Sequence, residues 1–588
     1  YPMLFRLGRE SSVSYSSHLR DSPLDMFLIY GPSYKHLLKR YSELTGFAPI
    51  PPKWSFGFWI SRAGYRSRAE VEDVVSEMRR RGFPCDVLSL DPWWMGDGPW
   101  CHYEWDEEHF PNPAEMMAGM RQQGIRTCVW IHPYVPKSHP LFKEGEALGV
   151  FVKDSNGDVC HVMEAFSSDD EGLAAVDFTN PAACQWWQSK LEKLMDMGVA
   201  VFKTDFGEQA PIDGIYFDGR SGLEMHNLYP LIYNRTAFEL SVKKNGRGLV
   251  WGRAAYAGSQ RYPVQWGGDS YSTLNQLACQ VRAMLGYGLS GVPFSSHDVG
   301  GFDFSPHYFD DCFHVDFTES YQADIKDAYP KDEVVYARWM QVGVFSSHVR
   351  AHGKQAREPW AFGEEVERIS KKYLQLRYRL MPYIYSQAVQ STRTGTPLAR
   401  PMLLEFQDDP TTQHIDLQYM FGDSFLIAPV LTRDGRIKVY LPAGNWVDYW
   451  TKEVHSGPQW LSMDVPLETL PIWVRAGSII PMGPEMDYVN QKPLNPLTIE
   501  LYLPQGSERI EIEDEDCDPI AVSYQRNGSK LLVEVGATRG NVEMILIGEH
   551  IRSASSDDKA LVVSQIASGS RIVLDGQSGV RILLELEG

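Results

Sequence analysis

Short apolar runs alternate with amphipathic stretches between Pro51 and about residue 390. The apolar runs close on a polar residue, as in WSFGFWIS, CDVLSLD, RTCVWIH, AVFKTD, GLVWGR and GLSGVPFSSHD. The stretches between them, such as RAEVEDVVSEMRRRG and NPAEMMAGMRQQG, space their apolar residues as a helix does. This alternation is typical of βαβ units, and its repetition predicts an α/β fold, a (β/α)8 TIM barrel with insertions.

Both ends of the chain have a different pattern of apolar runs and turns. After about residue 400, β-runs such as YMFGDSFLIAPVL and LTIELYLPQG are separated by Pro/Gly turns, which predicts C-terminal β-sandwich domains. Before Pro51, HLRDSPLDMFLIYGPSYKHLLKRYSELTG predicts a strand without a partner, a turn, and a helix that ends at Gly46. We therefore expect a short N-terminal remnant of a β-domain with a linker helix (1–48), the barrel (49–395), a proximal β-sandwich (396–480) and a distal β-domain (481–588).

Composition and charge exclude several classes of partner. The 588 residues carry a formal net charge of −20, which repels nucleic acid phosphates. No apolar run approaches the roughly 20 residues that a bilayer span needs. The eight cysteines are scattered, with no CxxC pair and no histidine partner at zinc spacing, so no metal site is expected. The start, YPMLFRLGRE, is not a signal peptide; cytoplasmic and secreted locations, and homo-oligomers, stay open.

Polar residues follow the predicted strands of the barrel. They are Asp91, His132, Asp205, Arg253, Asp269 and His297. Because the carboxyl ends of barrel strands converge on one face, where active sites of this fold lie, these residues are the candidates for chemistry.

The run Phe202-Lys203-Thr204-Asp205 is the first constellation. A strand places Lys203 and Asp205 on the same side because side chains alternate with a period of two. A cation beside a carboxylate lowers its pKa and keeps it ionised, as a nucleophile requires. A structural ion pair at the barrel mouth explains the same spacing.

The run Trp266-Gly267-Gly268-Asp269 is the second constellation. An apolar ring beside a carboxylic acid favours the neutral form, which suits a general acid. Alone, the run could equally be a turn with an aspartate cap. Glycoside hydrolysis needs two carboxyl groups that flank the scissile bond, so two at strand ends of one barrel favour a glycosidase.

FKTDFGE followed by WGGD, with PPKWSFGFW upstream and SHDVGGF downstream, resembles glycoside hydrolase family 31 over about Pro51 to residue 480. The blocks CVWIHPY and DFTNP are similar to its α-xylosidase branch. The resemblance implies that Asp205 is the nucleophile and Asp269 the acid/base of a retaining, exo-acting enzyme that uses no cofactor. It also implies that the sugar site is lined by Asp91, Lys203, Arg253, Trp266 and His297, with Trp130 and Trp93 as walls. Outside the family, Asp91 would be read as a helix cap, Arg253 as a core ion pair and His297 as a satisfied barrel histidine.

Two departures from the xylosidase branch bear on the sugar. Pro92-Trp93 follows Asp91 where that branch has Cys-Phe, and Arg62 stands roughly where it has a bulky Phe. We expect Arg62 to block the space beside C5 of the sugar, or else to swing outward against the acidic segment 303–332. An α-xyloside is therefore the first choice of substrate, an α-glucosidase or α-transglucosidase is the alternative, and a catalytically silent carbohydrate-binding protein is the rival from another class.

Two acidic segments accompany these motifs. Residues 303–332 are expected to form a solvated acidic loop, with a lid over the catalytic face as the functional alternative. The run Glu513-Asp514-Glu515-Asp516 is expected to be a structural turn, with a calcium site as the weaker alternative.

Overall fold

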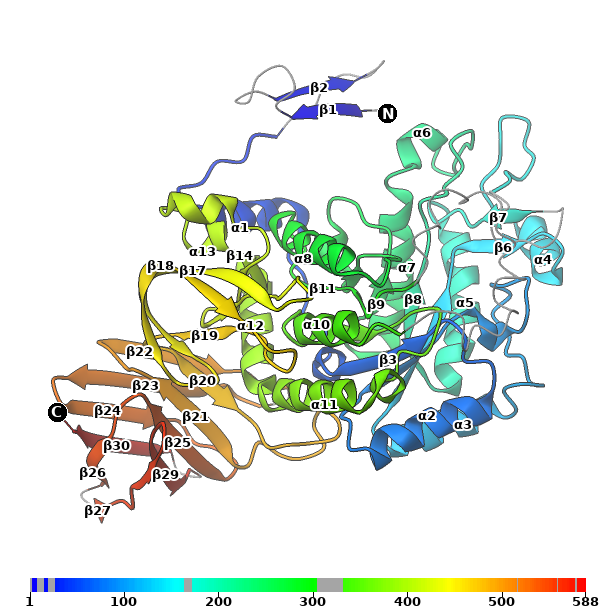
Figure 1. Cartoon of the computed structure of the whole chain (residues 1–588). Coiled ribbons are helices and arrows are strands. Elements are labelled where there is room, and N and C mark those ends of the chain that lie inside the picture. Colours follow the sequence, from blue (N-terminus) through cyan, green and yellow to red (C-terminus); the bar gives the residue numbers. More distant parts are fainter. Residues whose placement is uncertain are drawn as a thin grey trace.

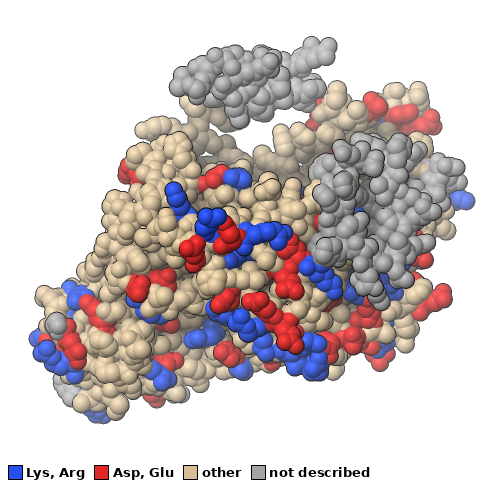
Figure 2. All heavy atoms as spheres, viewed as in Figure 1, with Lys and Arg blue, Asp and Glu red and all other residues tan. Residues whose placement is uncertain are grey.

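The computed structural model describes residues 3–7, 15–19, 27–162, 172–303, 331–515, 517–557, 559–576 and 579–587. Its centre is a barrel with β-sheets packed on one side (Figure 1). None of the helices in the described part of the chain is both long and apolar enough to cross a bilayer. On the face drawn in Figure 2, basic and acidic side chains are interspersed over the described surface.

Nine short strands form the barrel sheet, and all neighbours run parallel. In sheet order they are β11 (Ser295–Ser296), β10 (Gln265–Trp266), β9 (Val250–Gly252), β8 (Val199–Thr204), β5 (Arg126–Ile131), β4 (Val87–Leu90), β3 (Phe58–Arg62), β13 (Val349–Ala351) and β12 (Asp298–Val299). The first and last strands are one chain segment interrupted only at His297. The sheet therefore closes on itself, and the predicted eight-stranded barrel is confirmed.

Helices cover the outside of this barrel. They include α2 (Arg68–Arg80), α3 (Pro113–Gln122), α5 (Pro181–Met197), α7 (Tyr229–Asn245), α8 (Leu274–Leu289), α10 (Glu333–Val344), α11 (Glu364–Arg379) and α12 (Met381–Thr394). Helix α2 shows why these segments form: Ser67 caps its first turn, and Val71, Val74, Val75 and Met78 bury one face at helical spacing. The connection from β9 to β10 holds only the 3-10 turn Ser259–Arg261, and α1 (Tyr34–Thr45) packs there through hydrogen bonds from Gln260 to Thr45 and Gly46.

Two insertions lie on the catalytic face of the barrel. The hairpin β6 (Tyr134–Pro136) and β7 (Leu173–Ala175) and helix α4 (Pro140–Leu148) follow β5, and the short helix α6 (Gly222–Met225) follows β8. The N-terminal hairpin pairs β1 (Met3–Leu7) with β2 (Tyr15–Leu19). Directly before the GPS turn, where the sequence predicts a strand, the described residues 27–30 form no strand. Helix α1 ends before Gly46 as predicted.

The C-terminal part consists of antiparallel and mixed sheets. The proximal sheet has the order β14 (Ala399–Pro401), β15 (Tyr419–Phe421), β16 (Phe425–Ile427), β19 (Ile472–Arg475), β17 (Arg436–Asp448) and β18 (Val454–Asp464). One distal sheet has β20 (Ile479–Met482), β21 (Leu497–Tyr502), β25 (Asn541–Ile547), β29 (Gly569–Asp575) and β28 (Ser564–Ile566). The other has β22 (Ser507–Ile512), β23 (Ile520–Asn527), β24 (Lys530–Val535), β30 (Val580–Leu586), β26 (Ile551–Ser556) and β27 (Lys559–Ala560). Alternate residues of both distal sheets share one apolar core, as in a sandwich.

Buried polar contacts join these sheets to the barrel. The guanidinium of Arg338 in α10 donates to the backbone carbonyls of Val465, Pro466, Leu467 and Thr469. At the start of β4, the buried carboxylate of Asp86 accepts from the backbone N–H of Val489 at 3.1 Å. Because a buried polar group without its partner is costly, each part satisfies groups that the other would leave exposed or unpaired.

Candidate active site

The end of β8 carries the first predicted pair. Lys203 and Asp205 point the same way, with the ammonium 3.9 Å from the carboxylate. The indole N–H of Trp130 at the end of β5 donates to Asp205 Oδ2 at 2.7 Å, and the guanidinium of Arg253 after β9 lies 2.9 Å from Oδ1. Phe206 holds a left-handed backbone, φ 56°, which lets its N–H donate to Asp205. Residues from three neighbouring strands thus place hydrogen-bond donors or positive charges beside the buried carboxylate of Asp205.

These donors set the charge state of Asp205. Burial alone would raise its pKa, but the charges of Arg253 and Lys203 and the hydrogen bond from Trp130 outweigh it, so the pKa is lowered. The carboxylate stays ionised at neutral pH, as a nucleophile must.

A second carboxylate is held on the other side of Lys203. Asp91, at the end of β4, lies 3.0 and 3.1 Å from the ammonium. Despite burial, Lys203 and His352 lower the pKa of Asp91 well below its usual range. Lys203 therefore bridges two anions, and the ring of Trp266 completes the group, with the Lys203 ammonium 5.2 Å from its centroid.

Asp269, three residues beyond β10, has the opposite electrostatic environment. The residue is exposed to solvent, and desolvation by the protein is the largest effect on its pKa. Desolvation and the neighbouring charge of Asp205 raise its pKa to about 7, against the opposing effect of Arg253. A carboxyl group with this pKa holds its proton for much of the time at neutral pH and can donate it.

Arg253 links the two carboxyl groups. Besides Asp205 it contacts Glu208 at 2.6 Å, and its guanidinium lies 3.8 Å from the centroid of the Phe206 ring. It also lowers the pKa of Asp269, so it is within electrostatic reach of both.

His297, which the sequence suggested for the sugar site, is engaged within the barrel wall. His297 accepts from the indole N–H of Trp339 at Nδ1 (2.9 Å), and its Nε2 lies 3.0 Å from the hydroxyl of Ser346. Both ring nitrogens are engaged inside the barrel wall, and burial lowers its pKa to about 4, so the alternative of a satisfied barrel histidine describes it.

His352 is the histidine that lies in the cluster. It follows β13, and its Nε2 lies 3.3 Å from Lys203 Nζ and 3.4 Å from Asp91 Oδ2. Sequence reasoning missed it because the segment SSHVRAH is mostly polar and does not read as an apolar strand. Its Nδ1 meets the hydroxyl of Ser61 at 2.9 Å, so Ser61 is the β3 residue that faces the centre.

Arg62 is not brought to this centre. Arg62 directly follows Ser61 in β3, so its side chain points to the opposite side of the strand. Its guanidinium pairs with Glu70 of α2 and lies 4.0 Å from Glu358. It also covers the ring of Tyr65 at 4.7 Å. Arg62 therefore meets carboxylates, as a partly buried cation should, and within the described ranges these are Glu70 and Glu358 rather than Asp91.

Tryptophans extend from the nucleophile along the loop after β4. Trp130 lies 6.0 Å from Trp100, and Trp100 lies 5.2 Å from Trp93 (centroid distances), both edge to face. The guanidinium of Arg66 covers Trp93 at 3.7 Å. Trp130 thus contacts the nucleophile directly, whereas Trp93 is linked to the centre through Trp100 and Trp130.

The acidic segments give a mixed outcome. Residues 304–330 lie outside the described residues, so the lid alternative is not tested; at its edges Asp303 pairs with Lys354 and Asp332 with Arg433. In the other run, Asp514 meets Lys53, Glu513 meets Arg393 and Glu515 meets Arg247. Each described acidic residue of that run is paired with a cation of the protein, which supports the interpretation of the run as a structural turn.

Comparison with known proteins decides what the barrel is. Residues 48–387 match the TIM-barrel domain of glycosyl hydrolases family 31, and residues 395–480 match the C-terminal domain of that family. The chain belongs to glycoside hydrolase family 31. This confirms the resemblance that the sequence motifs indicated.

Individual family 31 members are similar over most of this chain. An α-xylosidase of Emericella nidulans is 33% identical over 568 residues, which cover 92% of this chain and 68% of that protein. An α-glucosidase of Bacillus thermoamyloliquefaciens is 31% identical over 551 residues, 90% of this chain and 65% of its own length. Among solved structures, a Flavobacterium johnsoniae family 31 dextranase complexed with glucose superposes with a TM-score of 0.85 at 26% identity, over 95% of this chain and 73% of the dextranase.

Proposed function

We propose that this family 31 hydrolase is a retaining, exo-acting α-glycosidase whose first choice of substrate is an α-xyloside. The observation that carries the proposal is the opposite tuning of two neighbouring carboxyl groups, with the pKa of Asp205 lowered and that of Asp269 raised to about 7. A silent carbohydrate-binding protein has no need for such a pair. The α-xylosidase relative supports xylose, and the α-glucosidase relative keeps glucose as the alternative.

The mechanism follows from the two charge states. Asp205 attacks the anomeric carbon while Asp269 gives its proton to the leaving oxygen, so the glycosidic bond breaks and a glycosyl ester forms on Asp205. Asp269, now ionised, takes a proton from water, and the water oxygen displaces Asp205 with a second inversion. The product keeps the α configuration. If a sugar hydroxyl reaches the ester before water, the same steps give transglycosylation.

A panel of aryl glycosides tests the substrate. Release of nitrophenol from aryl α-xyloside, α-glucoside and α-galactoside is compared as kcat/KM, and the anomer first formed is followed by NMR. We expect the α-xyloside to be the best of the three and the α-anomer to appear first. A higher kcat/KM on the α-glucoside would replace xylose by glucose, and no turnover of any member would favour the binding protein.

The pH dependence of kcat/KM follows from the same two groups. We expect the rate to fall as pH rises through about 7, because Asp269 then loses the proton it must donate. On the acid side the rate should hold until Asp205 is protonated, and the pKa of that group lies below its ordinary value. Initial rates between pH 4 and 9 measure both limbs. A profile that stays flat from about pH 6 to 9 on a poor leaving group would contradict the role of Asp269.

Arg62→Ala should leave the choice between sugars unchanged. The guanidinium is paired with Glu70 and Glu358 on the far side of β3, so its loss opens no space beside the sugar. We expect the ratio of α-xyloside to α-glucoside kcat/KM to stay within about twofold of wild type. A tenfold change in this ratio would need a difference of about 1.4 kcal/mol between the two sugars, and the substitution removes no sugar contact of that size. A rise in relative α-glucoside activity would restore Arg62 as the wall of the pocket; Trp93→Ala is the comparison variant.

A further inference from the structure

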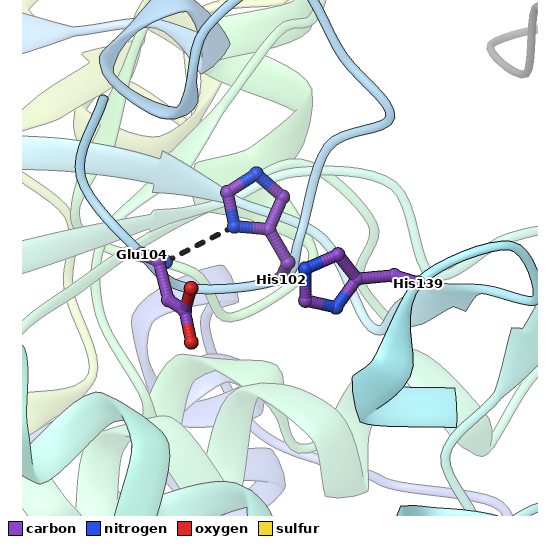
Figure 3. A group of neighbouring side chains, drawn as sticks. All are labelled: His102, Glu104 and His139. Atoms are coloured by element: carbon purple, nitrogen blue, oxygen red, sulfur yellow. Dashed lines mark hydrogen bonds between the residues drawn. The ribbon is translucent and has the colours of Figure 1, made fainter. Parts of the chain in front are cut away.

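Three metal-ligating side chains meet on the catalytic face, apart from Asp205 and Asp269. His102 and Glu104 lie in the loop after β4, and His139 precedes helix α4 (Figure 3). One ligand atom from each lies within 4.8 Å of the others, and within the described ranges no other group of His, Cys, Asp or Glu converges in this way. We propose that His102, Glu104 and His139 form a zinc site, which we name the rim site.

The second nitrogen of His102 supports this assignment. Its Nε2 lies 3.2 Å from the backbone carbonyl of Met95. A carbonyl only accepts, so Nε2 carries the ring proton and Nδ1 keeps its lone pair. Metal-binding histidines commonly donate their other N–H to such a carbonyl, which fixes the ring and its tautomer. Nδ1 receives only a long contact of 3.3 Å from the backbone N–H of Glu104, which an ion can displace.

His139 offers the second nitrogen. Its Nδ1 accepts from the N–H of Leu141 at 3.2 Å and caps α4, and Nε2 is the ring nitrogen on the side of His102 in Figure 3. Coordination through Nε2 requires the ring proton to move to Nδ1, so the ring stays neutral and the cap bond is lost. The two rings already stack, with centroids 4.8 Å apart and 18° between their planes. Zinc therefore replaces one hydrogen bond of His139 by a metal bond.

Charge and room also suit a zinc ion. The exposed carboxylate of Glu104 has no hydrogen-bond or ion-pair partner among the described residues, and it supplies a negative charge. Bonds of about 2.0 to 2.2 Å in a tetrahedron put ligand atoms roughly 3.4 Å apart, so the three groups must close by about 1.4 Å at most. Three protein ligands leave a fourth position for water.

A zinc ion here would fasten two loops of the catalytic face. The loop after β4 carries Trp100, which contacts Trp130, and Trp130 donates to Asp205. The other loop begins α4. The ion would thus brace the surroundings of the nucleophile while its own ligands stay outside the reaction, so binding can be measured separately from turnover.

Zinc titration of the metal-stripped full chain tests the rim site. Isothermal titration calorimetry with zinc chloride gives stoichiometry and Kd, and thermal unfolding with and without zinc gives the stabilisation. His139→Asn is the main variant, because Asn is a strong helix cap but cannot replace the imidazole ligand. Glu104→Gln removes the charge, and His109→Asn is the matched control, since His109 is an exposed histidine on the same loop that pairs with Asp106.

We expect one zinc per chain with a Kd in the micromolar range or tighter, and a raised Tm. The Kd should weaken at least about tenfold in His139→Asn and in Glu104→Gln and stay unchanged in His109→Asn, while all variants unfold like wild type without zinc. Equal binding by wild type and His139→Asn would place the ion elsewhere, and no binding by wild type at about 0.1 mM zinc would remove the site. Both results would leave the glycosidase proposal untouched.

Discussion

Asp205→Ala should abolish turnover on every α-glycoside while the fold remains. The carboxylate that forms the glycosyl ester is lost, and no other group in the described centre can replace it, because Asp91 is bound on both oxygens by Lys203. Loss of a covalent nucleophile costs several orders of magnitude, and we expect roughly 10⁴-fold or more in kcat. Initial rates of purified variant on the aryl panel measure it.

The fold should tolerate this change. Lys203 keeps Asp91, and Arg253 keeps Glu208, so neither cation is left without an anion. Circular dichroism and Tm close to wild type are the control that separates lost chemistry from lost structure. Retention of more than about a tenth of wild-type activity would show that Asp205 is not the nucleophile.

Asp269→Ala should penalise poor leaving groups far more than activated ones. General acid catalysis contributes about 10²- to 10⁴-fold, and a leaving group that departs without a proton does not need it. We expect natural disaccharides to lose this full factor, whereas glycosyl fluorides or dinitrophenyl glycosides keep much of their first-step rate. The second step then stalls, because no base activates water.

Azide makes this prediction specific. A small anion can attack the glycosyl ester without a base, so added azide should restore turnover of activated substrates and give the α-glycosyl azide. Asp205→Ala is the matched control and should give no α-glycosyl azide, since no ester forms and direct attack by azide on an activated substrate inverts once to the β-azide. Equal losses on good and poor leaving groups, with no azide product, would remove Asp269 from the acid/base role.

The sequence predicted the barrel and the meeting of its strand ends for a physical reason. In parallel βα units, every carboxyl end lies on one face, so Asp91, Asp205 and Asp269 had to be neighbours once the alternation was recognised. The pairing of Lys203 with Asp205 needed only the period of a strand. These inferences use local pattern and topology alone.

The remaining site residues depend on contacts that pattern does not reveal. His297 and His352 both follow barrel strands. The side chain of His297 lies in the barrel wall because it contacts Trp339 and Ser346, and these contacts cannot be read from the sequence pattern. The direction of Arg62 could have been predicted, because Ser61 faces the centre and neighbours in a strand alternate. The hydrogen bond from Trp130 to Asp205 joins adjacent strands and required their register.

The contacts of Arg338 and Asp86 with the C-terminal sheets have an evolutionary consequence. The barrel contributes the side chains of Arg338 and Asp86 and the C-terminal sheets contribute backbone groups, so on the sheet side the path of the chain matters more than the identity of the side chains. A gene fusion that exchanges the barrel between relatives preserves these hydrogen bonds only if the crossover point does not separate the barrel from the C-terminal sheets. Barrel and proximal sheet should therefore be inherited together, and new substrate preferences should arise through the loops of the catalytic face rather than through exchange of whole domains.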